Sequence, residues 1–265
     1  MLRDITIGRY INTLSPLHRA DARTKILAAV AYSVAVLAVK SYIGMGLVLI
    51  FTVTAAAASK IPAVYILKGL KPLRLFMLFT FITVFLTGSG DPIWQWHIFK
   101  ITENGIHNSI MVTLRFIFFV SGTSLLTLTT PPIALTDGLA RIMKPLKTVK
   151  APVDDIVMII SVTLRFIPLF ADEAERIMKA QRARGANFSG GGFIARAKAI
   201  IPVTIPLFIS VFRHADELAL AMDSRCYGKG TRKPLKKTHF GKTDAIIAII
   251  TIIFCIFSVI IGFLD

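Results

Sequence analysis

Charged residues are scarce in this chain of 265 residues, and acidic residues are the scarcer kind. Only 17% of the residues are charged, with 15 Asp and Glu against 31 Lys and Arg. Hydrophobic residues make up 54%, and the mean hydropathy is +0.68. Because charged residues are about a quarter of an ordinary soluble domain, this composition excludes a soluble globule. It indicates a membrane protein with a formal net charge of +16.

Cysteine is also scarce, and the basic residues lack the features that nucleic-acid binding requires. Cys226 and Cys255 predict no particular disulfide, and Cys226 lies in a basic region where a reduced thiol is the simpler state. No basic region is interleaved with stacking aromatics or contains a readout motif. We therefore expect no nucleic-acid partner, and we interpret the charge excess as that of cytoplasmic segments.

Motifs for catalysis, metal binding and nucleotide binding are missing. A phosphate-binding loop needs Gly-x-x-x-x-Gly-Lys-Ser/Thr, and position 236 is Lys where the first Gly is required before Gly241-Lys242-Thr243. The five histidines are scattered without ligand spacing, and no Ser, His and acid grouping predicts a hydrolase. We expect no catalytic residue, no metal site and no cofactor on this chain.

Apolar runs predict about five transmembrane helices. The runs cover residues 26–39, 43–58, 73–86, 108–129 and 245–263. The first two are short for a span of about 20 residues, but flanking positions can extend them into a helical hairpin. No short apolar core with a cleavage site follows the polar N-terminal segment, so we expect no cleavable signal.

The distribution of basic residues predicts the orientation. Of the 31 Lys and Arg, 28 lie in residues 1–25, 59–74 and 130–243, which we assign to the cytoplasm. The other three are Lys40, Lys100 and Arg115. We therefore expect a multi-pass protein of the cell membrane with a cytoplasmic N-terminus. The loop at 88–97, a turn followed by interfacial aromatics, and the C-terminus would lie outside.

Two further apolar stretches, 156–170 and 199–212, are interrupted by charge or proline. We assign them to long helices at or under the inner membrane face rather than to spans. The predicted fold is an all-α polytopic membrane protein in three parts. Residues 1–129 hold the N-terminal segment and four transmembrane helices, 130–243 form a cytoplasmic coupling domain of long helices, and 244–265 form the last transmembrane helix.

The coupling domain contains an internal duplication. Ile-Pro-Leu-Phe occurs at 167–170 and again at 205–208. Each copy leads to an acid, an Ala and an Arg, namely Glu175, Ala180 and Arg184 in the first copy and Asp216, Ala221 and Arg225 in the second. Repeated sequence usually means repeated structure. We predict two helices that begin at Pro168 and Pro206 and end in a cationic tip.

The two tip arginines are candidate docking residues. An Arg at a helix end presents a planar fork of donors that suits carboxylates on a partner, and its neighbours Ala183 and Ser224 are small. The alternative is that Arg184 and Arg225 only offset the helix dipoles. The spacing from the acid through Ala to Arg is the same in both copies, whereas the distance from Ile-Pro-Leu-Phe to Arg is three residues longer in the second copy. Dipole compensation does not require a repeated spacing, so the duplication favours docking of two matching partners.

These residues resemble a known family. Ala183-Arg184-Gly185 and Ser224-Arg225-Cys226 are similar to the paired Ala-Arg-Gly motifs of the transmembrane T component of energy-coupling factor transporters. The resemblance extends over nearly the whole chain, including Ser15-Pro16-Leu17-His18, Thr129-Thr130-Pro131 and Leu164-Arg165-Phe166-Ile167-Pro168.

The resemblance implies a non-catalytic coupling subunit. In that family the T component joins two cytosolic ATP-binding-cassette ATPases to a membrane S component that captures a vitamin or metal ion. Each Ala-Arg-Gly helix end docks in a groove on one ATPase, and the ATPases bind the ATP. Arg184 and Arg225 would be the docking residues here. Cys226 departs from the motif, which raises the question of how residue 226 turns the chain without glycine.

Arg115 is unusual because it lies inside a predicted span. Thr-Leu-Arg-Phe-Ile occurs at 113–117 and at 163–167. A charge within a span is costly and by default functional. We favour the alternative that Arg115 bonds to carbonyls inside the bundle and holds the spans against the coupling helices. The possible structural or coupling residues are Arg115, Arg165, Pro168 and Pro206.

A self-contained secondary transporter or channel is the alternative function. It predicts ionisable groups and broken helices at mid-membrane, in two related halves. Arg115 alone meets the first requirement, and the duplication lies in the basic cytoplasmic part. A membrane-embedded enzyme would need a group of catalytic residues, and the sequence contains no such group.

Overall fold

The fold consists of two compact units. The computed structural model describes residues 10–11, 13, 15–88, 92–96, 99–145, 152–186, 188, 190, 192–228 and 241–264. Residues 7–153 and 238–265 form one unit, the bundle unit, and residues 154–237 belong to the other, the two-helix unit. The predicted domain boundaries, after residues 129 and 243, stay a prediction. Helix α7 (Pro132–Ile142) packs on α2 (Ala22–Ala38) within the bundle unit.

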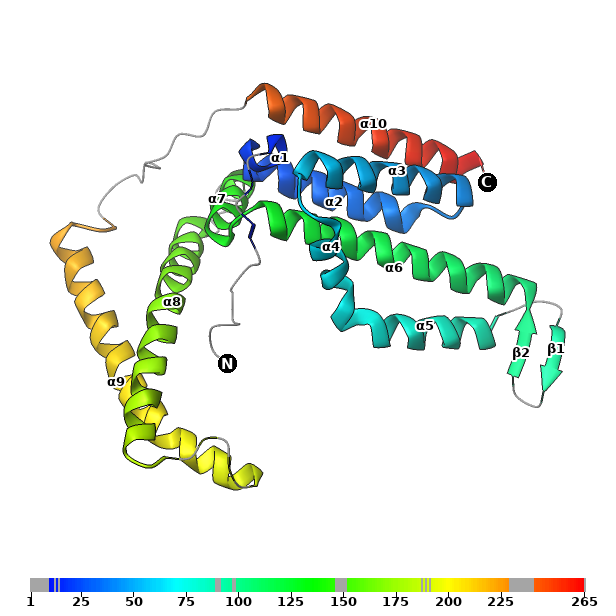
Figure 1. Cartoon of the computed structure of the whole chain (residues 1–265). Coiled ribbons are helices and arrows are strands. Elements are labelled where there is room, and N and C mark those ends of the chain that lie inside the picture. Colours follow the sequence, from blue (N-terminus) through cyan, green and yellow to red (C-terminus); the bar gives the residue numbers. More distant parts are fainter. Residues whose placement is uncertain are drawn as a thin grey trace. The chain divides into compact units, whose positions relative to one another are not determined.

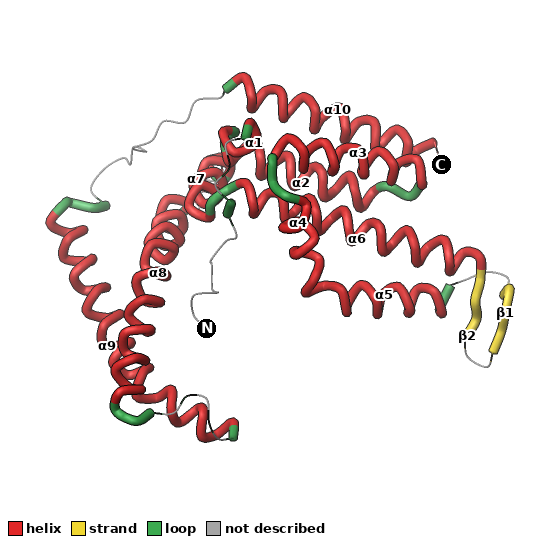
Figure 2. Tube along the Cα trace, in the orientation of Figure 1, coloured by secondary structure: helices red, strands yellow, loops and turns green. Residues whose placement is uncertain are grey.

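The described elements are mainly helical (Figures 1 and 2). The bundle unit also contains α1 (Pro16–Arg19), α3 (Tyr42–Ser59), α4 (Ala63–Leu70), η2 (Lys71–Leu73), α5 (Arg74–Leu86), β1 (Pro92–Trp96), β2 (Phe99–Thr102), α6 (Glu103–Thr129) and α10 (Lys242–Leu264). The two-helix unit contains α8 (Val153–Ala183) and α9 (Phe193–Ser224). The predicted all-α membrane class is confirmed.

A short antiparallel hairpin of β1 and β2 is a departure from the predicted loop between α5 and α6. Trp94 pairs with Ile101 and Gln95 with Lys100. The prediction of a turn followed by interfacial aromatics missed these strands. Aromatic and β-branched residues favour pleated structure, but a pair of four- and five-residue strands gives a weak signal beside long helical runs.

Five described helical stretches are long and apolar enough to cross a membrane: Tyr42–Ser59, Ala63–Leu86, Glu103–Thr129, Ala197–Ser224 and Lys242–Ile261. The predicted number of five is confirmed, but the set differs. The predicted first span lies in α2, which has 17 residues and so reaches only about 25 Å. Ala197–Ser224 is the least apolar of the five, and it contains residues 199–212, which are predicted from the sequence to be part of a long helix at or under the inner membrane face rather than a span.

Helix α6 is the centre of the bundle unit. It packs against α2, α3, α4 and α5, and α10 packs against α2 and α3 (Figure 1). Tyr32 of α2 is 4% exposed, and its hydroxyl donates to the carbonyl of Phe118 on α6 at 3.0 Å. The same hydroxyl lies 2.7 Å from Oγ1 of Thr52 on α3. One buried side chain therefore joins three helices.

The Tyr32 ring lies directly on a glycine of α6. A Cβ atom at Gly122 would come within 2.1 Å of Tyr32 Cε1. Small residues in membrane helices allow backbones to approach closely, and van der Waals packing then replaces the hydrophobic driving force that lipid removes. Gly122 is thus required by the position of Tyr32.

Both long helices of the two-helix unit run through their prolines. The prediction that each begins at its proline is wrong, because α8 begins at Val153 and α9 at Phe193, which leaves Pro168, Pro202 and Pro206 inside. A proline removes one backbone hydrogen bond and bends a helix, but apolar sequence on both sides continues it here. Figure 1 shows the bend in α9.

We expect Gly122→Ala to destabilise the bundle unit. The added methyl group would overlap the Tyr32 ring, and over-packing of this kind costs about 1 to 3 kcal/mol. Thermal unfolding of the purified protein in detergent measures the change. Gly46→Ala is the matched control, because a Cβ at this helical glycine of α3 meets no atom within 4 Å. Equal unfolding temperatures for the two variants would contradict the prediction.

Candidate functional site: two arginine-tipped helix ends

Helix α8 ends in a Schellman motif around Arg184. The amide of Gly185 donates to the carbonyl of Arg182 at 3.0 Å, and the amide of Ala186 donates to that of Gln181 at 3.0 Å. Gly185 has a φ of +90°, in the left-handed region that glycine favours. Arg184 is therefore the C-cap residue, and the chain turns away directly after it.

Helix α9 ends in the same motif around Arg225. The amide of Cys226 donates to the carbonyl of Asp223 at 2.9 Å, and the amide of Tyr227 donates to that of Met222 at 3.0 Å. These two bonds are equivalent to the two that close α8. Cys226 takes the left-handed position with a φ of 53°. Residue 226 thus turns the chain without glycine, at a conformational cost of roughly 1 kcal/mol or more.

Both tip arginines are exposed, as are their neighbours Ala183, Gly185, Ser224 and Cys226. Among the described residues, neither the Arg184 nor the Arg225 guanidinium forms an ion pair or donates a hydrogen bond. Two nearby cations, in contrast, have partners: Lys179 pairs with Glu175 at 3.0 Å, and Arg182 lies over the Phe188 ring at 5.7 Å. The tip arginines are therefore available to carboxylates of a partner.

Helices α8 and α9 meet at an aromatic cluster that the sequence did not predict. The His214 ring of α9 lies edge-on to Phe166 and Phe170 of α8, with centroid distances of 6.2 and 6.0 Å. The carbonyl of Ser210 lies 2.8 Å from His214 Nδ1. The spacing of the two Phe residues, four apart on one helix face, was the available signal. Figure 1 shows that α8 and α9 cross.

The remaining predicted residues do not belong to the helix tips. Arg165, Pro168 and Pro206 are exposed on α8 and α9. Arg115 of α6 donates from Nη2 to the carbonyl of Val39 at 2.6 Å, while its Nε is buried without a partner among the described atoms. Val39 is the C-cap of α2, so this bond ties α6 to the α2–α3 hairpin within the bundle unit.

A polar network joins the N-terminal ends of α2 and α10 and the C-terminal end of α6. Lys25 is 6% exposed, and its Nζ donates to the carbonyls of His18 and Thr129, each at 3.3 Å. The Asp21 amide donates to Asp244 Oδ1 at 2.7 Å. Partial burial lowers the pKa of His18, although its hydrogen bond to the Ile11 carbonyl opposes the shift. In the sequence, Lys25 was indistinguishable from a solvent-exposed flanking charge.

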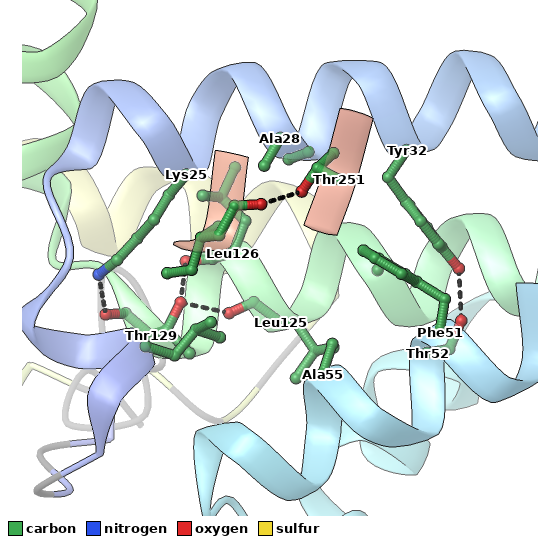
Figure 3. A pocket seen from close by; sticks show the side chains of 14 residues that line it. Lys25, Ala28, Tyr32, Phe51, Thr52, Ala55, Leu125, Leu126, Thr129 and Thr251 are labelled. Carbon is green, nitrogen blue, oxygen red and sulfur yellow. Dashed lines mark hydrogen bonds between the residues drawn. The ribbon is translucent and has the colours of Figure 1, made fainter. Parts of the chain in front are cut away.

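An apolar cavity of about 100 Å³ lies beside this network (Figure 3). Its lining includes Ala28, Phe51, Leu126 and Lys25. Thr251 and Thr129 bond to carbonyls of their own helices, so they offer no free donor. No group of three His, Cys, Asp or Glu side chains that could hold a metal occurs in the part of the chain that is described. The cavity suits apolar atoms and not phosphates or ions.

Comparisons with known proteins agree over almost the whole chain. The sequence model of the CbiQ family, described as cobalt transport protein, matches residues 14–236. The energy-coupling factor transporter transmembrane protein EcfT of Ruminiclostridium cellulolyticum is 44% identical over 255 residues, 96% of each chain. EcfT of Acidaminococcus fermentans is 43% identical over 251 residues, 94% of each chain. EcfT of Bacillus subtilis is 39% identical over 250 residues, 93% of this chain and 94% of the relative.

Substitutions at the left-handed positions should change the stability of the two helix ends in opposite directions. We expect Gly185→Ala to accelerate hydrogen exchange at the Ala186 amide about tenfold, because a side chain in the left-handed region costs roughly 1 to 2 kcal/mol. Cys226→Gly should slow exchange at the Tyr227 amide by a similar factor. Gly192→Ala, whose φ of −73° any residue adopts, is the control and should change neither amide. Unchanged exchange at Ala186 in Gly185→Ala would refute this account.

Arg115 is expected to stabilise the bundle unit without contributing to partner binding. Arg115→Met should lower the free energy of unfolding by about 1 to 2 kcal/mol, because it removes a hydrogen bond inside a membrane bundle. Arg115→Lys retains a hydrogen-bond donor, so its free energy of unfolding should fall by less. Thermal unfolding in detergent should therefore rank the wild type as most stable, Arg115→Lys next and Arg115→Met last. An Arg115→Met protein as stable as the wild type would show that the bond to Val39 contributes nothing.

Proposed function

The chain belongs to the CbiQ/EcfT family and is a transmembrane component of an energy-coupling factor transporter, and from this premise we propose that it couples two cytosolic ABC-type ATPases to a membrane S component. The S component would bind the transported vitamin or metal ion. ATP would be bound and hydrolysed by the partner ATPases, and this chain would be a non-catalytic subunit. The N-terminus would lie in the cytoplasm.

The observation that carries the proposal is that the two helix ends have the same geometry. Arg184 and Arg225 occupy the same C-cap position in two Schellman motifs with the same hydrogen bonds. Two copies of one exposed cationic structure fit two copies of one kind of partner surface. A helix dipole needs no such repetition of geometry.

The shape of each end suits insertion into a groove. The left-handed residue after each Arg turns the chain away, so the Arg is the last residue on the helix axis. Ala183 and Ser224 add little bulk beside it. The fork of an arginine can bond a carboxylate with two parallel hydrogen bonds, which supplies both energy and orientation.

The helices behind the tips are long enough to transmit motion. Helix α8 has 31 residues and α9 has 32, so each extends over roughly 45 Å. They meet at His214, Phe166 and Phe170, and a small aromatic contact can serve as a pivot. When ATP binding closes the two ATPases, the tips would move relative to one another and the helices would turn about this contact. Such coupling requires a two-state element with different contacts in each state.

The exposed apolar side chains of α9 are the proposed surface for the S component. Ile201, Ile205, Phe208 and Phe212 are each more than half exposed. Their spacing of three and four residues places them along one side of the helix. Reorientation of α9 would then turn the S component and release its substrate inward.

A self-contained secondary transporter or channel has less support. Within the spans predicted from the sequence, its requirement for ionisable groups at mid-membrane is met only by Arg115, and the bond to the Val39 carbonyl gives that residue a structural role. The duplicated element lies in α8 and α9, and its charged tips are exposed rather than directed into a pathway.

Removal of the tip arginines tests the docking role. We expect Arg184→Ala or Arg225→Ala to weaken ATPase association by about 2 kcal/mol, roughly 30-fold, as for a buried interface arginine. The double variant should abolish co-purification of both ATPases and abolish transport, while the protein stays in the membrane. Pull-down from native membranes followed by identification of the bound chains measures the effect.

The matched control is the double variant Arg176→Ala, Arg213→Ala. Both residues are exposed arginines on the same two helices, away from the tips, so this variant loses the same charge. It should retain both ATPases. If the tip variant co-purifies with both ATPases and transports normally, the docking assignment is wrong.

A further inference from the structure

The segment from Lys60 to Leu75 combines four cations with exposed apolar side chains. Lys60, Lys68, Lys71 and Arg74 are all exposed. No acidic residue occurs between Asp21 and Asp91, so the surrounding sequence cannot neutralise them. Among the described residues none of the four pairs with a carboxylate, although Lys68 lies over the Tyr65 ring at 5.2 Å. We call residues 60–75 the basic segment.

The basic segment includes the first residues of Ala63–Leu86, which is long and apolar enough to cross a membrane, and it lies beside the ends of two other apolar helices. It begins at Lys60, the C-cap of α3, which is long and apolar enough to cross a membrane. Ile66 of α4 is 8% exposed and packs with Ile61, Leu125 and Leu128. Because Leu125 and Leu128 belong to the last turns of α6, which ends at Thr129, α4 is held beside the end of a second such helix.

The close contact of α4 with α6 fixes which side of the segment faces outward. A Cβ at Gly69 would come within 2.6 Å of Ser124 Oγ, so the Ile66 and Gly69 side is packed against α6. Val64, Leu67, Lys68 and Lys71 follow at spacings of three and four residues, which places them together on another face. Val64 is 58% exposed and Leu67 62% exposed.

Cations and apolar side chains on one face, at the end of membrane helices, match the chemistry of a lipid interface. Apolar residues there insert at the acyl boundary, while the stems of Lys and Arg extend so that their charges reach the headgroups. Each Lys or Arg close to an anionic membrane surface adds electrostatic attraction to that surface. A free anion or an acidic protein would explain the charges but not the exposed Val64, Leu67 and Leu75.

We propose that the basic segment is a binding site for anionic phospholipid, with Lys68, Lys71 and Arg74 at the headgroup phosphate and Val64, Leu67 and Leu75 against the acyl chains. The site selects lipid by headgroup charge. It is independent of the docking role proposed for Arg184 and Arg225.

The test counts the lipids that the purified full-length protein retains. Detergent micelles are supplied with equal amounts of phosphatidylglycerol and phosphatidylcholine, and bound lipids are counted by native mass spectrometry. We expect the wild type to retain phosphatidylglycerol in preference. In the triple variant K68Q/K71Q/R74Q, the amount of bound phosphatidylglycerol should fall at least fivefold, and the amount of bound phosphatidylcholine should not change. Its helical circular dichroism should match that of the wild type.

The control variant R176Q/K198Q/R213Q removes three exposed cations from α8 and α9 and should retain phosphatidylglycerol as the wild type does. An equal loss in both variants would mean that only net charge matters, which overturns the proposal. Glycerol 3-phosphate should not displace the lipid, and displacement would indicate a small-anion site instead. A triple variant that keeps its phosphatidylglycerol but loses the ATPases would make the segment a protein-docking surface, which also overturns the proposal.

Discussion

Polar groups inside the bundle unit must find partners within the protein, because lipid offers none. Several buried side chains of the bundle unit meet this requirement, in two ways. Buried hydroxyls such as Ser121, Thr129 and Thr251 bond to carbonyls four residues earlier in their own helix. Tyr32 and Arg115 instead reach carbonyls of other helices, at Phe118 and Val39. These cross-helix bonds, together with the close approach that Gly122 allows, hold α2, α3 and α6 in register without help from a hydrophobic driving force.

In the two-helix unit the decisive property is where each helix stops. A helix that ended one residue later would present a different side chain to a partner and turn the chain elsewhere. Gly185 and Cys226 produce the same stop from different residues, and the hydrogen bonds that close each end are equivalent. Glycine takes the left-handed conformation without strain, whereas cysteine does not. The second end therefore has the same geometry as the first but is held less firmly by its local sequence.

Sequence reasoning succeeded where one local signal dominated. The runs at 43–58, 108–129 and 245–263 lie within α3, α6 and α10, because a long apolar run leaves few alternatives to a helix. It failed where two local signals competed. Pro168 and Pro206 suggested helix starts, but the apolar sequence on both sides continued α8 and α9 through them. The hairpin of β1 and β2 was missed because its strands are too short to give a clear period.

The sequence by itself determined the membrane class, the repeated tip motif and the left-handed stop at Gly185, since composition, repetition and glycine chemistry are local properties. Only the tertiary structure decided which distant polar groups meet. Lys25 donates to the Thr129 carbonyl 104 positions away, and the Asp21 amide meets Asp244 across 223 positions. Tyr32 lies on Gly122 for the same reason. Such contacts depend on how whole helices pack, and no window of sequence contains both partners.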